Sequence, residues 1–213
     1  MRLQFRPATP ADSELAAPLI HSSGPAAFDY VFDVVSRAGA RDFLRHAFAD
    51  GPGEFGFRNH TIVMQDDQVV AVGAAWSGRS TLAFTLAAGR QILSVYGPLS
   101  GPGVVVRGLR VETVIQPPAR SCWYVGHLAV AERWRGHGIG AALVDHLLAR
   151  GREQGFAHAA LDVAVTNPHA ERLYARLGFA TSVERISQLK NARAAVANHR
   201  RMERAIAAAP SAP

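Results

Sequence analysis

The segment from Trp123 to Gly151 constrains the fold more than any other part of the chain. It contains an apolar run from Tyr124 to Val130, a short polar connection, the glycine-rich sequence RGHGIG at 135–140, and a stretch with helical periodicity. The apolar run predicts a buried strand, and the apolar spacing after the glycines predicts an amphipathic helix over 138–154. Glycines at a strand-to-helix junction let backbone N–H groups approach an anion, which the helix dipole also favours. The junction therefore predicts a phosphate or pyrophosphate site.

A dinucleotide site is one reading of these glycines. Gly136, Gly138 and Ala141 fit the pattern G-x-G-x-x-G/A, and Asp162 follows at about the twenty-residue spacing of a ribose-binding acid. However, residues 131–135 intervene between the strand and the first glycine, and Asp162 stands near the start of its expected strand. The unit also follows an expected hairpin instead of opening a βαβ series. These features disfavour a dinucleotide fold.

Composition indicates an ordinary packed protein. The chain has 213 residues, of which 48% are hydrophobic and 19% are charged, values typical of globular domains. No run of about 18 apolar residues predicts a membrane span. The single cysteine, Cys122, and an N-terminus without an apolar signal core lead us to expect a cytoplasmic protein with no membrane partner.

The net charge of +6 comes from basic residues spread along the chain, and they are dense only near its end. We expect one domain over 1–187, followed by a basic C-terminal helix and frayed tail over 188–213, with the helix at 188–208. A solvated basic helix explains this segment, so nucleic acid is not an expected partner. Contact of the tail with nucleic acid or with a second subunit is the alternative.

Periodicity and turn residues predict the remaining elements. Strands are expected at 3–6, 60–65, 68–76, 123–130, 159–165 and 179–186, and helices through Ile20 and at 26–35, 40–49, 138–154 and 168–177. Asn167 and Pro168 are a typical N-cap and first helical residue. The segment 77–121 is the least clear, and we favour a helix over 104–115.

Three stretches resemble one protein family. LAVAERWRGHGIGAALVDHLL, at 128–148, resembles the acetyl-CoA motif of the GNAT (GCN5-related) N-acetyltransferases, and Arg135, Gly138 and Gly140 fit its pattern. LDVAVTNPHAERLYARLGF, at 161–179, resembles the family's following strand, Asn, helix, Tyr and Gly-Phe. The sequence RPATPADSELAAPLI near the N-terminus resembles its first strand and helix. The resemblance covers about residues 1–186 and is poorest over 77–121.

This resemblance implies an α/β (α+β) fold with a mixed, mostly antiparallel sheet flanked by helices. Two parallel strands, 123–130 and 159–165, would splay apart and hold acetyl-CoA between them. The backbone of Leu128 and Val130 would pair with the pantetheine arm, and N–H groups of 136–140 would meet the pyrophosphate. The residues that the resemblance assigns to acetyl-CoA are Leu128, Ala129, Val130, Arg135, Gly136, His137, Gly138, Ile139, Gly140, Asn167 and Tyr174.

The implied reaction is acetyl transfer from acetyl-CoA to a primary amine by direct attack, without a metal. An alkylammonium has a pKa of about 10 and must lose a proton before it can attack. Tyr174, seven residues after Asn167, matches the family's proton donor to the leaving thiolate. His127 and Asp162 are both candidate bases, Asp162 through a water, and each could instead be a structural polar residue.

The acceptor is expected to be a small-molecule or peptide amine, set by segments 22–49 and 77–121. The aromatic residues of the first segment, with two acids, either line a cavity for a small cation or belong to the core: Phe28, Asp29, Tyr30, Phe32, Asp33 and Phe43. A non-catalytic acyl-CoA sensor or scaffold of the same fold is the alternative function. A homodimer is compatible with the sequence.

Overall fold

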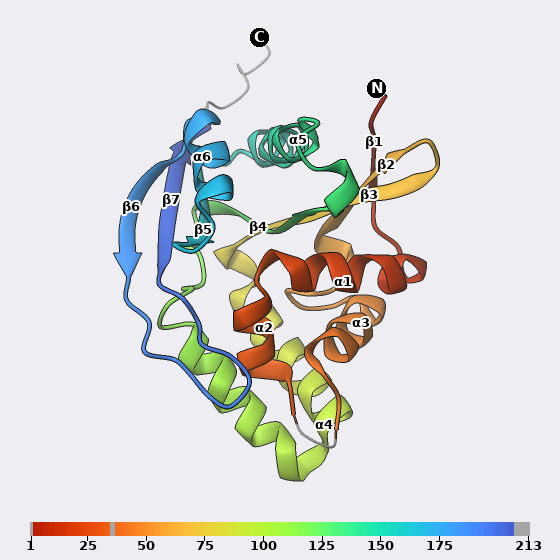
Figure 1. Ribbon diagram of the computed structural model, residues 1–213, viewed down its shortest axis with the longest axis vertical. Coiled ribbons are helices and arrows are strands. Elements are labelled where there is room, and N and C mark those ends of the chain that lie inside the picture. Colours follow the sequence, from red (N-terminus) through yellow and green to blue (C-terminus); the bar gives the residue numbers. More distant parts are fainter. Residues whose placement is uncertain (1, 35–36, 207–213) are drawn as a thin grey trace.

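The computed structural model describes residues 2–34 and 37–206 and contains a seven-stranded sheet with helices on both faces (Figure 1). The strand order is β1-β2-β3-β4-β5-β7-β6, and only β4 and β5 run parallel. The strands are β1 (Gln4–Pro7), β2 (His60–Gln65), β3 (Gln68–Ser77), β4 (Cys122–Val130), β5 (His158–Ala164), β6 (Ala180–Arg185) and β7 (His199–Ala205). The helices are α1 (Ser13–Ser23), α2 (Pro25–Phe32), α3 (Ala40–Asp50), α4 (Thr81–Val111), α5 (Ile139–Glu153) and α6 (Pro168–Arg176). The predicted mixed, mostly antiparallel sheet is confirmed.

The sheet separates two hydrophobic cores. Helices α1 to α4 cover one face, and α5 and α6 cover the other (Figure 1). Successive side chains of a strand point to opposite faces, so Ile62 of β2 enters the first core while its neighbour Val63 enters the second. Phe43 fills the first core and Leu147 the second, and neither side chain is exposed. Both faces of the central strands are therefore buried.

Strands β4 and β5 pair only at their beginnings. The parallel register joins Cys122 to His158 and ends at the pair Tyr124 and Ala160. Beyond that point β4 continues beside β3, and β5 continues beside β7. The two strands therefore diverge, as predicted, and the edge of β4 that faces β5 is left without a strand partner from Val125 onward.

A β-bulge interrupts β4 where the two strands part. Val72 pairs with Ala129 and Ala74 with Gly126, so His127 and Leu128 together lie opposite the single residue Gly73. His127 has a backbone φ of 54°, a left-handed conformation that non-glycine residues seldom adopt. Bulges redirect side chains and are frequent beside active sites. Here the bulge turns the His127 ring toward the α1–α3 side of the sheet, against Phe28 of α2.

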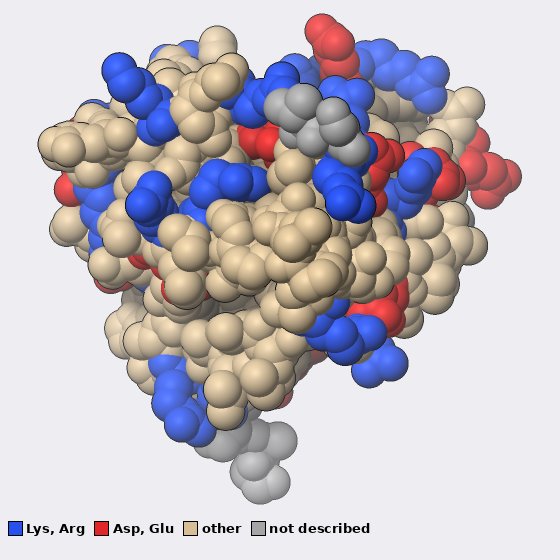
Figure 2. All heavy atoms as spheres, turned by 90° about the horizontal axis from the view of Figure 1, so that it is seen from below, with Lys and Arg blue, Asp and Glu red and all other residues tan. Residues whose placement is uncertain are grey.

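The segment before β4 forms a bent helical pair. The expected helix over 104–115 is present to Val111, as the second arm of α4, and Gly97, with a φ of 70°, breaks the helix between the arms. One side of α4 packs on α2 and α3. Figure 2 views the molecule from below, the side on which α4 lies, and uncharged atoms make up most of that face. The exposed apolar side chains of α4 are Leu82, Leu86, Leu93, Leu99, Val106 and Leu109.

The predicted basic C-terminal helix is wrong. Most of 188–198 is irregular, and His199–Ala205 forms β7, which lies between β5 and β6 in the sheet. The strand at 179–186 is therefore not the last one. Arg201 is buried in β7, where it pairs with the buried acid Asp162. Because a charged residue occupies this inward-facing position, the sequence lacks the alternation of apolar and polar residues that usually predicts a strand. The expected frayed tail, 207–213, lies outside the described residues.

Within residues 2–34 and 37–206, no helix is both long enough and apolar enough to cross a membrane.

Candidate active site

A cavity of about 280 Å³ opens where β4 and β5 diverge. The strands contribute Val125 to Leu128 from β4 and Leu161 and Asp162 from β5. Tyr174 of α6 closes one side, and both segments expected to set the acceptor, 22–49 and 77–121, line the other. The cavity thus brings together all three residues predicted to carry the chemistry: His127, Asp162 and Tyr174.

His127 is held by a second histidine that the sequence did not single out. Nε2 of His60 lies 3.2 Å from Nδ1 of His127, and Nδ1 of His60 lies 2.8 Å from the carbonyl oxygen of Gly56. Burial, with a smaller contribution from the charge of His127, lowers the pKa of His60 to about 3, so His60 is neutral at physiological pH. The Gly56 carbonyl can only accept, so the His60 proton is on Nδ1 and its Nε2 accepts.

This arrangement fixes the tautomer of His127. Since His60 accepts at Nε2, Nδ1 of His127 must donate to it, and neutral His127 then carries its lone pair on Nε2. That atom lies 3.4 Å from Oε1 of Glu54, and the His127 side chain is 8% exposed. Both His127 and Glu54 line the cavity. Nε2 is therefore positioned to take a proton, and Glu54 to stabilise the imidazolium that results.

The loop that carries Glu54 is tied down on two sides. The Asn59 amide donates to the carbonyl of Gly53 at 2.6 Å. From α4, the buried Gln91 donates to the carbonyl of Pro52 at 3.0 Å. Gly53 has a φ of 85°, a conformation that suits glycine. The loop therefore holds Glu54 in place beside His127.

Aromatic rings enclose His127. Its ring stacks on Phe55 with a centroid distance of 5.3 Å and an interplanar angle of 25°. Trp76 and Phe28 lie 5.3 and 6.0 Å away, and both line the cavity. A Cβ at Gly126 would come within 2.8 Å of the Trp76 indole, so only glycine lets this ring approach β4. The wall is apolar, with π faces that attract cations.

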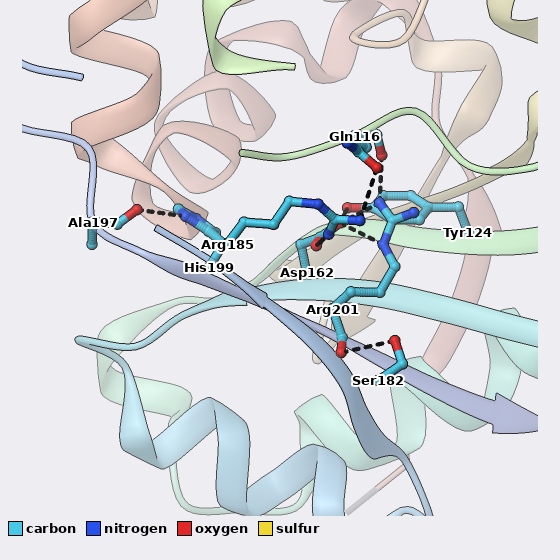
Figure 3. A network of polar contacts seen from close by, with 8 residues as sticks. All are labelled: Gln116, Tyr124, Asp162, Ser182, Arg185, Ala197, His199 and Arg201. Atoms are coloured by element: carbon cyan, nitrogen blue, oxygen red, sulfur yellow. Dashed lines mark hydrogen bonds and ion pairs between the residues drawn. The ribbon is translucent and has the colours of Figure 1, made fainter. Parts of the chain in front are cut away.

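The carboxylate of Asp162, the other candidate base, is paired with a cation and accepts hydrogen bonds within the protein (Figure 3). Its side chain is 2% exposed, and Oδ2 accepts from Nη2 of Arg201 at 2.6 Å and from the Tyr124 hydroxyl at 2.8 Å. Arg201 also donates to the carbonyl of Gln116, and Arg185 lies 3.9 Å from Oδ1. A carboxylate engaged in this way is poorly placed to accept a substrate proton.

Tyr174 projects from α6 into the same cavity and is 8% exposed. Burial raises the pKa of its hydroxyl to about 12, so the phenol stays protonated at neutral pH. Its placement follows from the helix start, where the Asn167 side chain accepts from the Ala170 N–H at 3.1 Å, the expected N-cap. Tyr174 is thus available as a proton donor.

The glycine-rich loop precedes α5 as predicted. Gly136 and Gly138 have φ values of 80° and 78°, and a Cβ built on either would meet no atom within 4 Å. The N-terminus of α5, a helix of 15 residues, begins at Ile139. Arg135 donates from Nε to the carbonyl of Val130 at 3.1 Å, which links the loop to the end of β4.

These features fit acetyl-CoA. The open space at the loop, the positive end of α5 and the unpaired edge of β4 are what a pyrophosphate and an extended amide-containing arm require. Leu128, Ala129 and Val130 lie along that edge. His137 is exposed, and its Nδ1 lies 2.8 Å from the Arg135 carbonyl oxygen.

The aromatic and acidic residues of segment 22–49 lie partly at the cavity and partly elsewhere. Phe28 and Phe32 line the cavity, whereas Tyr30 and Phe43 lie in the core. Asp29 pairs with His21 at 2.7 Å, and Asp33 lies 3.9 Å from Arg193. Neither acid lines the cavity. Burial raises the pKa of the Cys122 thiol to about 11, so the thiolate, which is the nucleophilic form, is scarce at neutral pH.

The described residues contain no cluster of three or more His, Cys, Asp or Glu side chains arranged to hold a metal ion.

Comparison with known proteins supports the same assignment. The model of the Acetyltransferase (GNAT) family matches residues 57–179, more than half of the chain. The chain belongs to this family. No curated protein matches the sequence. The family acts on small-molecule or peptide amine acceptors and generally uses acetyl-CoA.

Solved structures share the fold. A crystal structure described as an acetyltransferase has 21% identity and a TM-score of 0.70, covering 96% of this chain and 100% of its own. An N-acetyltransferase from Staphylococcus aureus Mu50 has 17% identity and a TM-score of 0.68, covering 94% and 100%. A GCN5-related N-acetyltransferase from Kribbella flavida has 18% identity and a TM-score of 0.58, covering 95% and 97%.

Sequence reasoning missed His60, Glu54 and Glu112, which lines the cavity beside Glu54. His60 stands 67 residues from His127, so no local spacing connects them. Glu54 follows a Gly-Pro-Gly break that indicates only a loop. Glu112 follows α4, in the segment with the poorest resemblance. The three are brought together only by the fold.

Proposed function

We propose that this GNAT protein is an N-acetyltransferase that moves the acetyl group of acetyl-CoA to a primary amine by direct attack, with His127 as the base. The observation that carries the proposal is the position of His127, which lines the cavity with its Nε2 atom 3.4 Å from Oε1 of Glu54, another lining residue. The fixed tautomer of His127 supports it over Asp162, whose carboxylate is bound by Arg201 and Tyr124.

The chemistry balances with the residues at hand. His127 removes a proton from the substrate ammonium, and the free amine attacks the thioester carbonyl carbon. The carbon–sulfur bond breaks, and Tyr174 protonates the departing thiolate. As the amide forms, the nitrogen loses its second proton. In the net reaction one proton ends on the CoA thiol and one is released to solvent.

The donor half of the site has a separate role. Backbone N–H groups of 136–140 bind the pyrophosphate, and Arg135, His137 and Asn167 border it. The backbone at Leu128 and Val130 pairs with the pantetheine arm. A backbone N–H near Leu128 stabilises the negative charge that develops on the thioester oxygen.

Release of free thiol from acetyl-CoA on addition of primary amines tests the proposed function. We expect amine-dependent release, with the acetylated amine found by mass spectrometry. The alternative, an acyl-CoA sensor, predicts saturable acetyl-CoA binding without release for every amine in a panel of alkylamines, arylalkylamines, amino acids and peptides. That result would reject the enzymatic function.

Replacing Tyr174 with Phe is expected to lower kcat by about 10- to 100-fold, because general acid catalysis by one positioned group contributes on that order or more. The ring and its packing remain, so the Kd for acetyl-CoA should change little. Steady-state kinetics and calorimetric titration measure the two quantities. A kcat equal to that of the unmodified protein removes Tyr174 from the mechanism.

A further inference from the structure

The charge of the cavity wall is one-sided. Three carboxylates line it, from Glu54, Glu112 and Asp162, and no Lys or Arg side chain does so among the described residues. Asp162 is offset by Arg201, which lies behind it in β7. Glu54 and Glu112 are not offset in this way, although the protein as a whole carries a net charge of +6. The local field therefore favours a cation and opposes an anion.

Aromatic and aliphatic side chains make up much of the remaining wall. Phe28, Phe55 and Trp76 surround the His127 ring, and side chains of α2 and α4 extend this surface away from the strands. His127 of β4 and Tyr174 of α6 reach the cavity beside the diverging strands, and each is about nine-tenths buried. They mark the reacting end, so the apolar wall faces the body of the acceptor.

Glu112, just after the end of α4, lines the same cavity as Glu54. The residue is exposed to solvent overall, but partial burial of its carboxyl, and then the charge of Glu54, raises the pKa of that group. Glu54 and Glu112 also line a second, smaller cavity that shares Phe55, Trp76 and Tyr124 with the first. The two acids therefore stand where the two cavities meet.

We propose that the acceptor is a small hydrophobic amine that carries no carboxylate, with its ammonium group held between Glu54 and His127 and its apolar body against the aromatic wall. This inference rests on the proposed function, because it names the acceptor of that same site. A free amino acid is rejected, since its carboxylate would enter a wall that already holds two uncompensated carboxylates and offers no cation to pair with it.

Three amines with one skeleton separate charge from size. These are 2-phenylethylamine, phenylalaninamide and phenylalanine, of which the last two differ by a neutral amide against a carboxylate of nearly equal bulk. We expect calorimetric titration of the protein saturated with CoA to show binding of the first two, at least about tenfold tighter than phenylalanine, because juxtaposed like charges are costly. Thiol release from acetyl-CoA is measured in parallel.

Removing one carboxylate tests whether the acids of the cavity wall cause the preference for phenylalaninamide over phenylalanine. Glu112→Gln should reduce the affinity ratio of phenylalaninamide to phenylalanine by at least about threefold, since it removes one of the two opposing charges. Glu153→Gln, an exposed acid on α5 outside the cavity, should leave the ratio unchanged.

Binding of phenylalanine as tight as that of phenylalaninamide would overturn the inference, as would the absence of binding by all three amines. The expected order of binding, with no thiol release for these amines or for any amine of the wider panel, would support the inferred class of ligand but reject the enzymatic function. The two failures are thus distinguished.

Discussion

Replacing His127 with Asn is expected to lower kcat by about 10²- to 10⁴-fold, the range that a positioned general base contributes. Asn is the appropriate substitute because it tolerates the left-handed backbone conformation that His127 adopts at the bulge. Its amide can still donate a hydrogen bond toward His60, but it cannot take a proton from the substrate. The variant should fold normally, bind acetyl-CoA with an unchanged Kd, and lose the acidic limb of its pH–rate profile.

His146→Asn is the matched control. His146 lies on α5, where it stacks on Phe5 with a centroid distance of 4.7 Å, and it does not line the cavity. Its replacement should leave kcat within about twofold of the unmodified protein, because this half-buried residue lies outside the cavity. If His127→Asn retains kcat and the acidic limb, His127 is not the base, and proton transfer must pass through another group.

The local structure of the proposed donor half was predictable because its determinants are contiguous in sequence. The glycine junction, the N-cap at Asn167 and the position of Tyr174 are each encoded within fewer than ten residues of sequence. Local signals such as these specify a backbone conformation directly, through φ values that glycine tolerates and caps that satisfy helix ends. The diverging strands were likewise inferred from the family resemblance, and the register of β4 and β5 bears it out.

The acceptor half was not predictable in the same way. The pair of His60 and His127 joins two strands through tertiary contact, and the bulge that orients His127 leaves no distinct sequence pattern. Along α4 apolar residues face both the interior and the solvent, as Ile92 and Leu93 illustrate. The sequence of α4 therefore lacks the one-sided apolar periodicity that usually predicts a surface helix. An acceptor site assembled from such segments becomes visible only in the folded chain.

In the C-terminal segment, a buried charged residue leads to a wrong prediction. The sequence predicts that the adjacent residues Arg200 and Arg201 belong to a basic surface helix, but in β7 they have different partners. Arg201 pairs with the buried Asp162, whereas Arg200, at the surface, pairs with Glu171 at 2.7 Å and Glu184 at 2.8 Å. Both guanidinium groups are thus paired with carboxylates of the same chain, one in the interior and one at the surface. This weakens the alternative in which the segment contacts nucleic acid.

Replacing Arg201 with Met should lower the free energy of unfolding by about 3–5 kcal/mol, the cost of removing one partner of a buried ion pair. Asp162, which is 2% exposed, would be left as a buried carboxylate with only the Tyr124 hydroxyl at 2.8 Å and the more distant Arg185 at 3.9 Å. Urea denaturation measures the loss. Adding Asp162→Asn to the variant removes the uncompensated charge, and the double variant should regain much of the stability.

Arg200→Met is the control from the same strand. Its guanidinium bonds to carboxylates that remain accessible to water, so the loss of stability should be much smaller than for Arg201→Met. Equal losses for the two variants would mean that the Asp162–Arg201 pair is no more important than a surface pair. The expected difference would instead identify this pair as a buried side-chain contact that reinforces the pairing of β5 and β7 beside the cavity, and so as support for the wall on which the acceptor amine is proposed to bind.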